Sequence, residues 1–164
     1  MPLPQDHATP FGSTAVGMVD FPVRLPSLFS NRSITWTSDS KYLFALSHDA
    51  KIYFLDVHST PTDSHSWFIR SKIDPTCISL SSDGTFIAAS AGSSVSFWDT
   101  TTYKKIQGNI HHPARVTCMA ISPNYDLVTS GGMKISLWNL CDILPSPYPD
   151  NVKTIDGQDL TILG

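Results

Sequence analysis

The sequence predicts an all-β fold of about three four-stranded antiparallel sheets, and two observations support this prediction. First, the stretch that runs from residue 76 to Trp98-Asp99 is repeated from residue 117 to Trp138-Asn139, and the two tryptophans are 40 positions apart. Repeats of about 40–45 residues are typical of the four-stranded blades of a propeller. Second, the 164 residues include 12 prolines, and many serines and threonines, which favour turns and strands over long helices.

A third copy of the pattern precedes these two. It alternates apolar and polar residues around Ile34 and Trp36 and ends at Leu55-Asp56, and Asp56 lies 43 positions before Asp99. Over residues 32–140 the chain resembles the WD-repeat family, in which an apolar first strand, a turn similar to Ser-Pro-Asp-Gly and a closing Trp-Asp mark each blade. The resemblance implies a partial WD-repeat β-propeller whose ring is incomplete.

The chain divides into an arm, three repeats and a final segment. Residues 1–30 carry five prolines and are expected to form a loose arm, in which 19–24 is a candidate edge strand. The three repeats span about 31–70, 74–108 and 113–140. Residues 141–164 are proline-rich and are expected to begin with one helical turn. Either 152–155 or 160–163 is the candidate last strand, and the sequence does not decide between them.

Alternation of apolar and polar residues places the strands within the repeats. They are expected at 34–36, 42–47, 52–56 and 67–69, at 76–81, 85–90, 94–99 and 104–107, and at 115–121, 126–130 and 134–139. Tight hairpins are expected at Ser82-Asp83-Gly84, at Gly92-Ser93-Ser94 and at Gly131-Gly132, where glycine supplies the positive φ that a tight turn requires.

Three blades would leave two apolar faces open, and each large apolar side chain left in water costs about 1.5–3 kcal/mol. The faces would be covered by further blades of a longer chain, by a second copy that completes the ring, or by a partner. We favour the first solution, because residues 97–103 and 137–145 resemble the C-terminal WD repeats of fungal NACHT-type signalling proteins. That resemblance implies a sensor or scaffold module. The chain has no Gly-x-x-x-x-Gly-Lys-Ser/Thr loop, so no nucleotide cofactor is expected.

Composition excludes several other classes of function. The net charge is −3 and the lysines and arginines are scattered, so no nucleic-acid partner is expected. No apolar run approaches the roughly 18–20 residues of a membrane span, and the first residues do not form a secretory signal, so we expect no membrane partner and a cytoplasmic protein. The cysteines, Cys77, Cys118 and Cys141, lack metal-binding spacing. Cys77 and Cys118, at equivalent repeat positions, are interpreted as core residues, and no metal is expected.

In the family that the chain resembles, a buried His, a Ser or Thr, an Asp and a Trp form a hydrogen-bonded chain within each blade. The third repeat offers His112, Trp138 and a hydroxyl from Thr129 or Ser130, but Gly132 stands where the Asp belongs. The first repeat keeps the acid and loses the Trp, and the second has a glycine at the acidic position. No repeat holds the whole chain of bonds, so less rigid blades are expected. The residues assigned structural roles are Asp49, Asp56, Trp98, Asp99, His112 and Trp138.

The predicted function is a non-catalytic protein-protein interaction or scaffold module. The resemblance implies that partners dock on one rim, formed by the loops that join successive blades and by the hairpins between second and third strands. The candidate rim residues are His48, Asp49, Arg70, Lys72, Ser93, His111, Arg115 and Lys134, with Trp67 and Tyr103 as alternative aromatic anchors.

Two alternatives to this function stay open from the sequence alone. One is a hydrolase or lyase that uses the carboxylates of Asp83, Asp99 and Asp126 on a propeller-like scaffold. The other is a truncated product with no independent role. The identity of the partner does not follow from the sequence.

Overall fold

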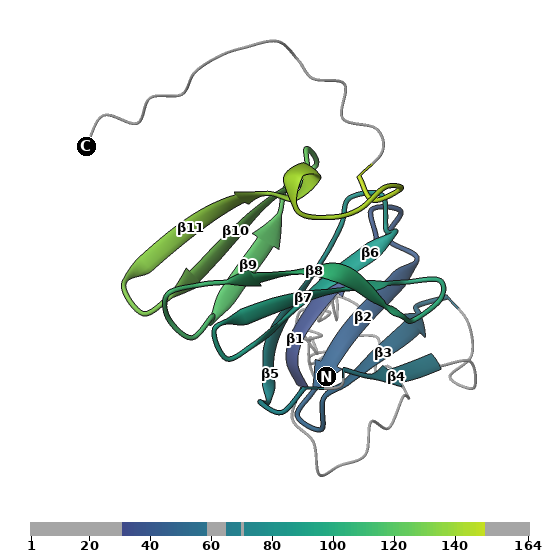
Figure 1. Ribbon diagram of the computed structural model, residues 1–164. Coiled ribbons are helices and arrows are strands. Elements are labelled where there is room, and N and C mark those ends of the chain that lie inside the picture. Colours follow the sequence, from purple (N-terminus) through teal and green to yellow (C-terminus); the bar gives the residue numbers. More distant parts are fainter. Residues whose placement is uncertain (1–30, 59–64, 70, 150–164) are drawn as a thin grey trace, which may run out of the picture.

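The computed structural model describes residues 31–58, 65–69 and 71–149, which form three antiparallel sheets arranged side by side (Figure 1). Blade 1 contains β1 (Asn31–Trp36), β2 (Tyr42–Ser47), β3 (Lys51–Asp56) and β4 (His65–Phe68), in that spatial order. Blade 2 contains β5 (Pro75–Leu80), β6 (Phe86–Ala91), β7 (Ser94–Asp99) and β8 (Lys105–His111). Blade 3 contains β9 (Cys118–Ile121), β10 (Asp126–Gly131) and β11 (Lys134–Asn139).

The all-β class and the sequential hairpins are confirmed, and the predicted helical turn after β11 is the 3₁₀ helix η1 (Leu140–Asp142). In the described part of the chain blade 3 has three strands rather than four. The strand expected from residue 115 begins only at Cys118. This is because the Val116 amide donates to the Gly92 carbonyl of blade 2, at 2.8 Å, instead of joining the ladder of blade 3. The candidate strands at 19–24, 152–155 and 160–163 lie outside the described residues.

The first hairpin of every blade is built in the same way. A hydroxyl at the end of the first strand accepts a hydrogen bond from the amide that begins the second strand, and one residue of the turn takes a left-handed conformation. The acceptors are Thr37, Ser81 and Ser122, and the left-handed residues are Ser40, Gly84 and Tyr125.

The second hairpins also follow the prediction, with one difference at the glycine pair. Gly92 and Gly132 have φ of +63° and +60°, as expected. Gly131 is required for another reason: a Cβ at this position would lie 2.2 Å from the Arg115 carbonyl oxygen. The backbone of the loop that enters β9 therefore packs directly on the end of β10.

The residue that closes each repeat, an aspartate or an asparagine, caps a turn. Asp56, Asp99 and Asn139 each accept a hydrogen bond from the amide two residues further on, at 2.9 Å in all three blades. Asn139 replaces the carboxylate without loss of this bond, because the amide side chain offers the same acceptor oxygen.

Blade 2 packs against a blade on each side, and alternate residues of its strands face the two neighbours. Ile87, Ala89 and Trp98 belong to a buried cluster shared with blade 1, whereas Phe86 and Phe97 belong to a cluster shared with blade 3. The innermost strand β5 lies between β1 and β9 (Figure 1). Hydroxyls bridge these inner edges, since Ser33 accepts from the Ile78 amide and Ser79 from the Ile121 amide.

The segment after β11 turns back onto blade 2. Leu140 and Leu144 are buried in the cluster between blades 2 and 3, and the Tyr148 hydroxyl donates to Asp99. Gly108 of β8 permits this approach, because a Cβ there would lie 3.0 Å from the Ile143 carbonyl oxygen. The segment thus fills the outer end of the seam between the two blades.

The outer face of blade 3 is open. Leu137 and Ile135 of β11 are 68% and 78% exposed, and Val128 and Met133 are exposed beside them. In the described residues the three blades do not close into a ring (Figure 1), so an apolar face remains uncovered at this end, as predicted. No helix in the described part of the chain has the length and hydrophobicity to cross a membrane.

The two faces of blade 3 provide a matched test of this packing. Leu127 is fully buried against blade 2, whereas Leu137 is mostly exposed. We expect Leu127→Ala to lower the free energy of unfolding in urea by about 2–5 kcal/mol. The same change at Leu137 should lower it by less than about 0.5 kcal/mol. Equal losses at the two positions would contradict the arrangement of the blades.

Candidate functional site

The loops at one end of the blades form a continuous surface, which we call the rim; it comprises the turns at 47–50, 92–93 and 132–133 and the loops at 71–74 and 112–117. Neighbouring loops are joined by backbone contacts. The Ile69 amide donates to the Ala50 carbonyl, and the His112 amide donates to the Ser93 carbonyl, both at 2.8 Å. Each of these two bonds extends the ladder of its own blade, whereas the bond from the Val116 amide to the Gly92 carbonyl joins the loop that enters blade 3 to the turn of blade 2.

The structure places most of the predicted rim residues at this end, in the loops and turns or at the strand ends beside them. The side chains of His48, Lys72, Ser93, His111, Arg115 and Lys134 are exposed, and Asp49 is half-buried. Arg70 lies outside the described residues. The His111 Nδ1 atom is 3.0 Å from the Ser94 hydroxyl, which fixes the imidazole at the edge of blade 2.

The two ends of the blades differ in charge. The described rim carries Lys51, Lys72, Arg115 and Lys134 with Asp49 and Asp74, whereas the opposite end carries Asp39, Asp56, Asp83, Asp99, Asp126 and Asp142 with Lys41, Lys104 and Lys105. Asp49 is paired locally, since its carboxylate lies 3.2 Å from the Lys51 ammonium and accepts a hydrogen bond from Ser47. Lys72, Arg115 and Lys134 make no ion pair with a described residue. Within the described structure the rim thus presents three cations without an ion-pair partner.

Within blade 3 part of the expected hydrogen-bonded chain is present. The Trp138 indole donates to the Thr129 hydroxyl at 3.0 Å, so Thr129 rather than Ser130 supplies the oxygen. His112 is buried, and its Nδ1 atom lies 3.1 Å from the Ala114 amide nitrogen. Its Nε2 atom is buried without a hydrogen-bond partner in the described structure.

In blade 2 the corresponding tryptophan has lost its acceptor. Trp98 pairs across the strands with Ile87 as Trp138 pairs with Leu127, so Ala89 occupies the place of Thr129. Because alanine has no hydroxyl, the Trp98 indole nitrogen is buried and has no partner among the described residues. A buried donor without a partner costs about 1–3 kcal/mol. Trp98 is accordingly a packing residue of the seam with blade 1, not a member of a hydrogen-bonded chain.

A cleft of about 250 Å³ lies where these polar groups are missing. Trp98 and Ala89 line it together with Ser71. Ser71 is equivalent to His112, because it stands six residues before Cys77 as His112 stands six residues before Cys118. The sequence predicted that the hydrogen-bonded chain of His, Ser or Thr, Asp and Trp is incomplete in this repeat, but it did not predict a cleft. The sequence does contain a sign of this cleft, because the positions of the His, the hydroxyl and the Asp in this repeat carry the small residues Ser71, Ala89 and Gly92.

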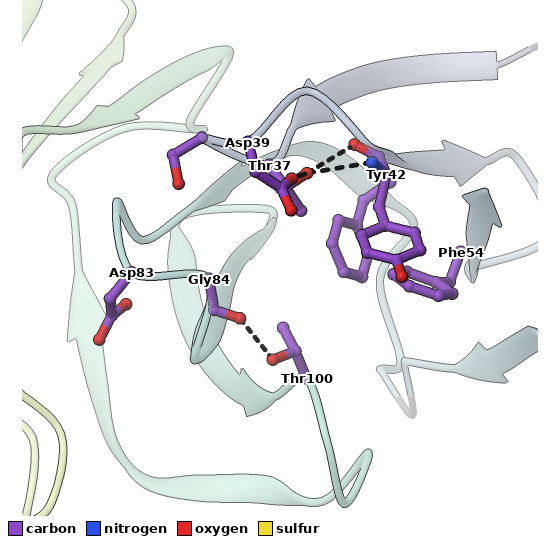
Figure 2. A pocket seen from close by; sticks show the side chains of 9 residues that line it. Thr37, Asp39, Tyr42, Phe54, Asp83, Gly84 and Thr100 are labelled. Atoms are coloured by element: carbon purple, nitrogen blue, oxygen red, sulfur yellow. Dashed lines mark hydrogen bonds between the residues drawn. The ribbon is translucent and has the colours of Figure 1, made fainter. Parts of the chain in front are cut away.

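A second cleft, of about 270 Å³, lies at the acidic end between the first hairpins of blades 1 and 2 (Figure 2). Asp39 and Asp83 line it, and the Thr100 hydroxyl donates to the Gly84 carbonyl at 2.6 Å. Both carboxylates are used by their own turns. Asp39 accepts from the Lys41 amide and Asp83 accepts from the Thr85 amide, each at 3.1 Å.

Two tyrosines connect blade 2 to the elements that follow it. The Tyr125 hydroxyl of blade 3 donates to Asp83 at 2.8 Å, and the Tyr148 hydroxyl donates to Asp99. Burial and the hydrogen bond to Asp83 raise the pKa of Tyr125 to about 12. The hydrogen bond to Asp99, with burial, raises the pKa of Tyr148 to about 12.

These contacts bear on the carboxylates considered for catalysis. Burial works against the ionisation of Asp83 and Asp99, but the hydrogen bonds that they accept outweigh it, so the pKa of each carboxyl lies below its usual value. A general acid at neutral pH needs a raised pKa. Asp83 and Asp99 therefore have the electrostatics of turn-capping residues.

The interpretation of the cysteines is half right. Cys77 is buried between blades 2 and 3, but Cys118 is exposed. The two residues occupy equivalent positions on their blades, and the face that carries Cys118 is the open face of blade 3. In the described part of the chain His, Cys and Asp side chains form no cluster of three that could hold a metal ion.

One alternative aromatic anchor is also corrected. Trp67 is only 9% exposed, because its ring packs in the seam between blades 1 and 2, against Phe44. Tyr103 covers it from blade 2 with ring centroids 4.8 Å apart. Trp67 is thus a seam residue and is not available to a partner.

Comparison with known proteins finds a family match in two stretches of the chain. Residues 62–99 and 104–139 match the WD40 family model, described as WD domain, G-beta repeat. Each match begins at or just before the outermost strand of one blade, β4 or β8, and ends with the third strand of the next. No curated protein matches the chain significantly.

Solved structures with the same fold include WD40 propellers. The WD40 repeats of RRP9 are 20% identical over 71% of this chain, with a TM-score of 0.58, and this covers 37% of that chain. U3-55K is 18% identical over 71%, with a TM-score of 0.60 and 38% of its chain covered. The hydrazine synthase of Kuenenia stuttgartiensis is 18% identical over 69%, with a TM-score of 0.60 and 33% covered. The matched part of this chain thus corresponds to about a third of the length of each of these proteins.

The loss of the hydroxyl in blade 2 can be reversed. We expect Ala89→Ser to give the Trp98 indole an acceptor and to raise the free energy of unfolding by about 0.5–1.5 kcal/mol. In blade 3 the reverse change, Thr129→Ala, should lower it by about 1–3 kcal/mol, because Trp138 then loses its acceptor. Urea unfolding measures both. A destabilised Ala89→Ser variant would show that the indole does not point toward residue 89.

The two tyrosine bonds predict a loss of stability at alkaline pH. A tyrosine whose pKa is raised in the folded state stabilises the fold fully below its unfolded pKa, near 10, and loses this contribution as the pH rises through about 12. We expect the free energy of unfolding to fall between pH 10 and pH 12, and to fall less in Tyr148→Phe.

The control for this experiment is Tyr103→Phe. Tyr103 makes a ring contact with Trp67, and no hydrogen bond of its hydroxyl is described. The alkaline decline should be the same in Tyr103→Phe as in the parent protein. An undiminished decline in Tyr148→Phe would argue against a bond between Tyr148 and Asp99.

Proposed function

We propose, from the premise that residues 62–99 and 104–139 are WD40 repeats, that this chain is a non-catalytic protein-interaction module and that partners bind at the rim. WD40 repeats generally serve as scaffolds for protein interactions. The observation that carries the proposal is the rim itself, where the loops that enter blades 2 and 3 bond by their backbones to the turns beside them, and the Arg115 carbonyl packs on Gly131. Such a surface is rigid before binding, which reduces the entropy lost on association.

The charge of the rim favours an acidic partner. Lys72 and Arg115 stand on two loops and Lys134 begins β11, and none of them makes an ion pair with a described residue. Cations that are not neutralised by their own chain attract a partner of opposite charge, speed its association and select against basic surfaces. The acidic opposite end would orient the partner away from itself.

The open face of blade 3 favours a second proposal, which concerns assembly. Ile135, Leu137 and Val128 form an apolar sheet face equivalent to the face of blade 2 that is buried against blade 3, but this face is exposed to water. The three blades would then form part of a larger ring. The resemblance of residues 97–103 and 137–145 to the C-terminal WD repeats of fungal NACHT-type signalling proteins is consistent with such a sensor module.

Site-specific photocrosslinking tests both proposals. A benzoylphenylalanine is placed at Arg115 or Lys134 on the rim, at Lys41 or Lys104 on the opposite end, or at Ile135 on the open face. After irradiation in cell extract, crosslinked proteins are identified by mass spectrometry. We expect the rim positions to yield a common acidic partner, and the yield at position 134 to fall about tenfold when Arg115→Glu is introduced.

The remaining positions serve as controls. Equal yields from the rim and from Lys41 or Lys104 would contradict the rim as the binding surface. Crosslinks at Ile135 to a second copy of this chain would support completion of the ring by self-association. If Ile135 gave no crosslink to any chain with WD40 repeats, the proposed larger ring would be wrong.

A further inference from the structure

We propose that the rim binds an acidic segment of the partner that also carries apolar side chains, and that Ile73 and Met133 receive those apolar side chains. This inference rests on the proposed function and names the chemistry of the segment that binds there. It combines two properties of one surface. Three cations of the rim have no ion-pair partner in the described structure, and two large apolar residues of the rim are exposed.

Met133 has the highest exposure of the large apolar residues in the described chain. It is 103% exposed, at the tip of the turn between β10 and β11. A side chain this exposed buries no apolar surface, so it adds nothing to the packing of the blades. Methionine is flexible and polarisable, which allows it to adapt to the shape of a bound apolar side chain.

Ile73 lies on the loop that enters blade 2 and is 53% exposed. Its Cδ1 atom is 3.1 Å from the place that a Cβ would take at Gly92, so one side of Ile73 packs on the turn between β6 and β7 while the rest faces water. Ile73 is thereby held in place before a partner arrives, which reduces the entropy lost on binding.

The loop that enters β9 lies between these two apolar residues. On one side, a backbone bond of 2.8 Å joins this loop to Gly92, the glycine that Ile73 covers. On the other side, the Ala114 Cβ atom is 3.4 Å from the place that a Cβ would take at Gly132, the residue before Met133. The two apolar residues and the loop thus form one strip across the rim.

Positive charge accompanies the strip around the loop and its Met133 end. Lys134 follows Met133 directly, and Arg115 stands on the loop. At the other end Ile73 stands between a lysine and an aspartate, at positions 72 and 74. A segment that covers the apolar residues brings its neighbouring side chains to these cations, so acidic side chains are favoured there and basic ones are rejected.

The two kinds of contact act on different rates. Exposed charges attract a partner from a distance and are screened by salt, so they mainly raise the association rate. Covering Met133 and Ile73 removes apolar surface from water, which stabilises the complex after the encounter and lowers the dissociation rate. Reversal of a charge and truncation of an apolar residue therefore have separable effects.

Selection from an unbiased peptide library tests the inference. Random dodecapeptides displayed on phage are selected on the purified chain, and the enriched sequences are synthesised. We expect the enriched peptides to combine several aspartates or glutamates with leucine, isoleucine, phenylalanine or methionine, because only such peptides use both properties of the strip.

The association and dissociation rates of these peptides are then measured by surface plasmon resonance. Arg115→Glu should lower the association rate severalfold to about tenfold, and added salt should do the same. Met133→Ala and Ile73→Ala should each raise the dissociation rate severalfold to about tenfold, and Met133→Leu should retain most of the affinity.

Matched controls come from outside the rim. Ile34 of β1 is 58% exposed, similar to Ile73, and Lys41 stands at the opposite end. Ile34→Ala and Lys41→Glu should leave both rates unchanged. Thermal unfolding of each variant shows whether a change in rate reflects a change in the fold.

Several results would overturn the inference. Enriched peptides without acidic residues would do so, as would peptides that lose binding in Ile135→Ser and not in Met133→Ala, because they bind the open face of blade 3. Peptides that depend on Arg115 but bind Met133→Ala and Ile73→Ala as they bind the parent would remove the apolar contacts and leave the proposed function intact. If no peptide depends on a rim residue, the inference is wrong, and the crosslinks at Arg115 and Lys134 decide the proposed function separately.

Discussion

Every sheet in this protein has two apolar faces, and each face can be covered only by another sheet or by a segment laid across it. Blade 2 satisfies this constraint fully, because Ile87 and Trp98 pack toward blade 1 while Phe86 and Phe97 pack toward blade 3. Its neighbours satisfy it on their inner sides. The backbone bond between Val116 and Gly92, the hydroxyl bridges between inner strands and the bond from Tyr125 to Asp83 connect one blade to the next. The interactions of the described chain are thus concentrated in two seams.

The hydrogen-bonded chains inside the blades are secondary to this packing. Among the described residues, only blade 3 has a bond between its tryptophan and a hydroxyl, and blade 2 buries an indole donor with no acceptor. The cost of that donor is comparable to the gain from burying one large apolar side chain, and Trp98 contributes such burial in the seam with blade 1. Members of the hydrogen-bonded chain can therefore be absent from a blade without loss of the fold. Where the hydroxyl is missing in blade 2, a cleft lies beside Trp98, lined by small, apolar and cationic side chains.

The elements within each blade could be predicted from the sequence, because they depend on local patterns. Alternation located the strands, and the glycines at positions 84, 92 and 132 marked turns that the structure confirms. The errors involve contacts between blades. Cys118 has the same local context as Cys77 but faces a side without a neighbour, and Trp67 is covered by Tyr103 from another repeat. The requirement for Gly131, the bonds of Tyr125 and Tyr148 and the cleft beside Trp98 likewise arise from residues about 40 or more positions apart or from a neighbouring loop, which no local pattern encodes.

The sequence repeat and the folded sheet are out of phase by one strand. Each WD40 match takes in the outer strand of one blade and the three inner strands of the next. Such a unit supplies the outer strand of the preceding sheet and the first three strands of the next one. Adding one more unit therefore always leaves a last sheet that lacks its outer strand. A deletion designed at repeat boundaries would remove the edge of a blade that it was meant to spare. Cuts placed in the loop between β8 and β9 would instead separate whole sheets.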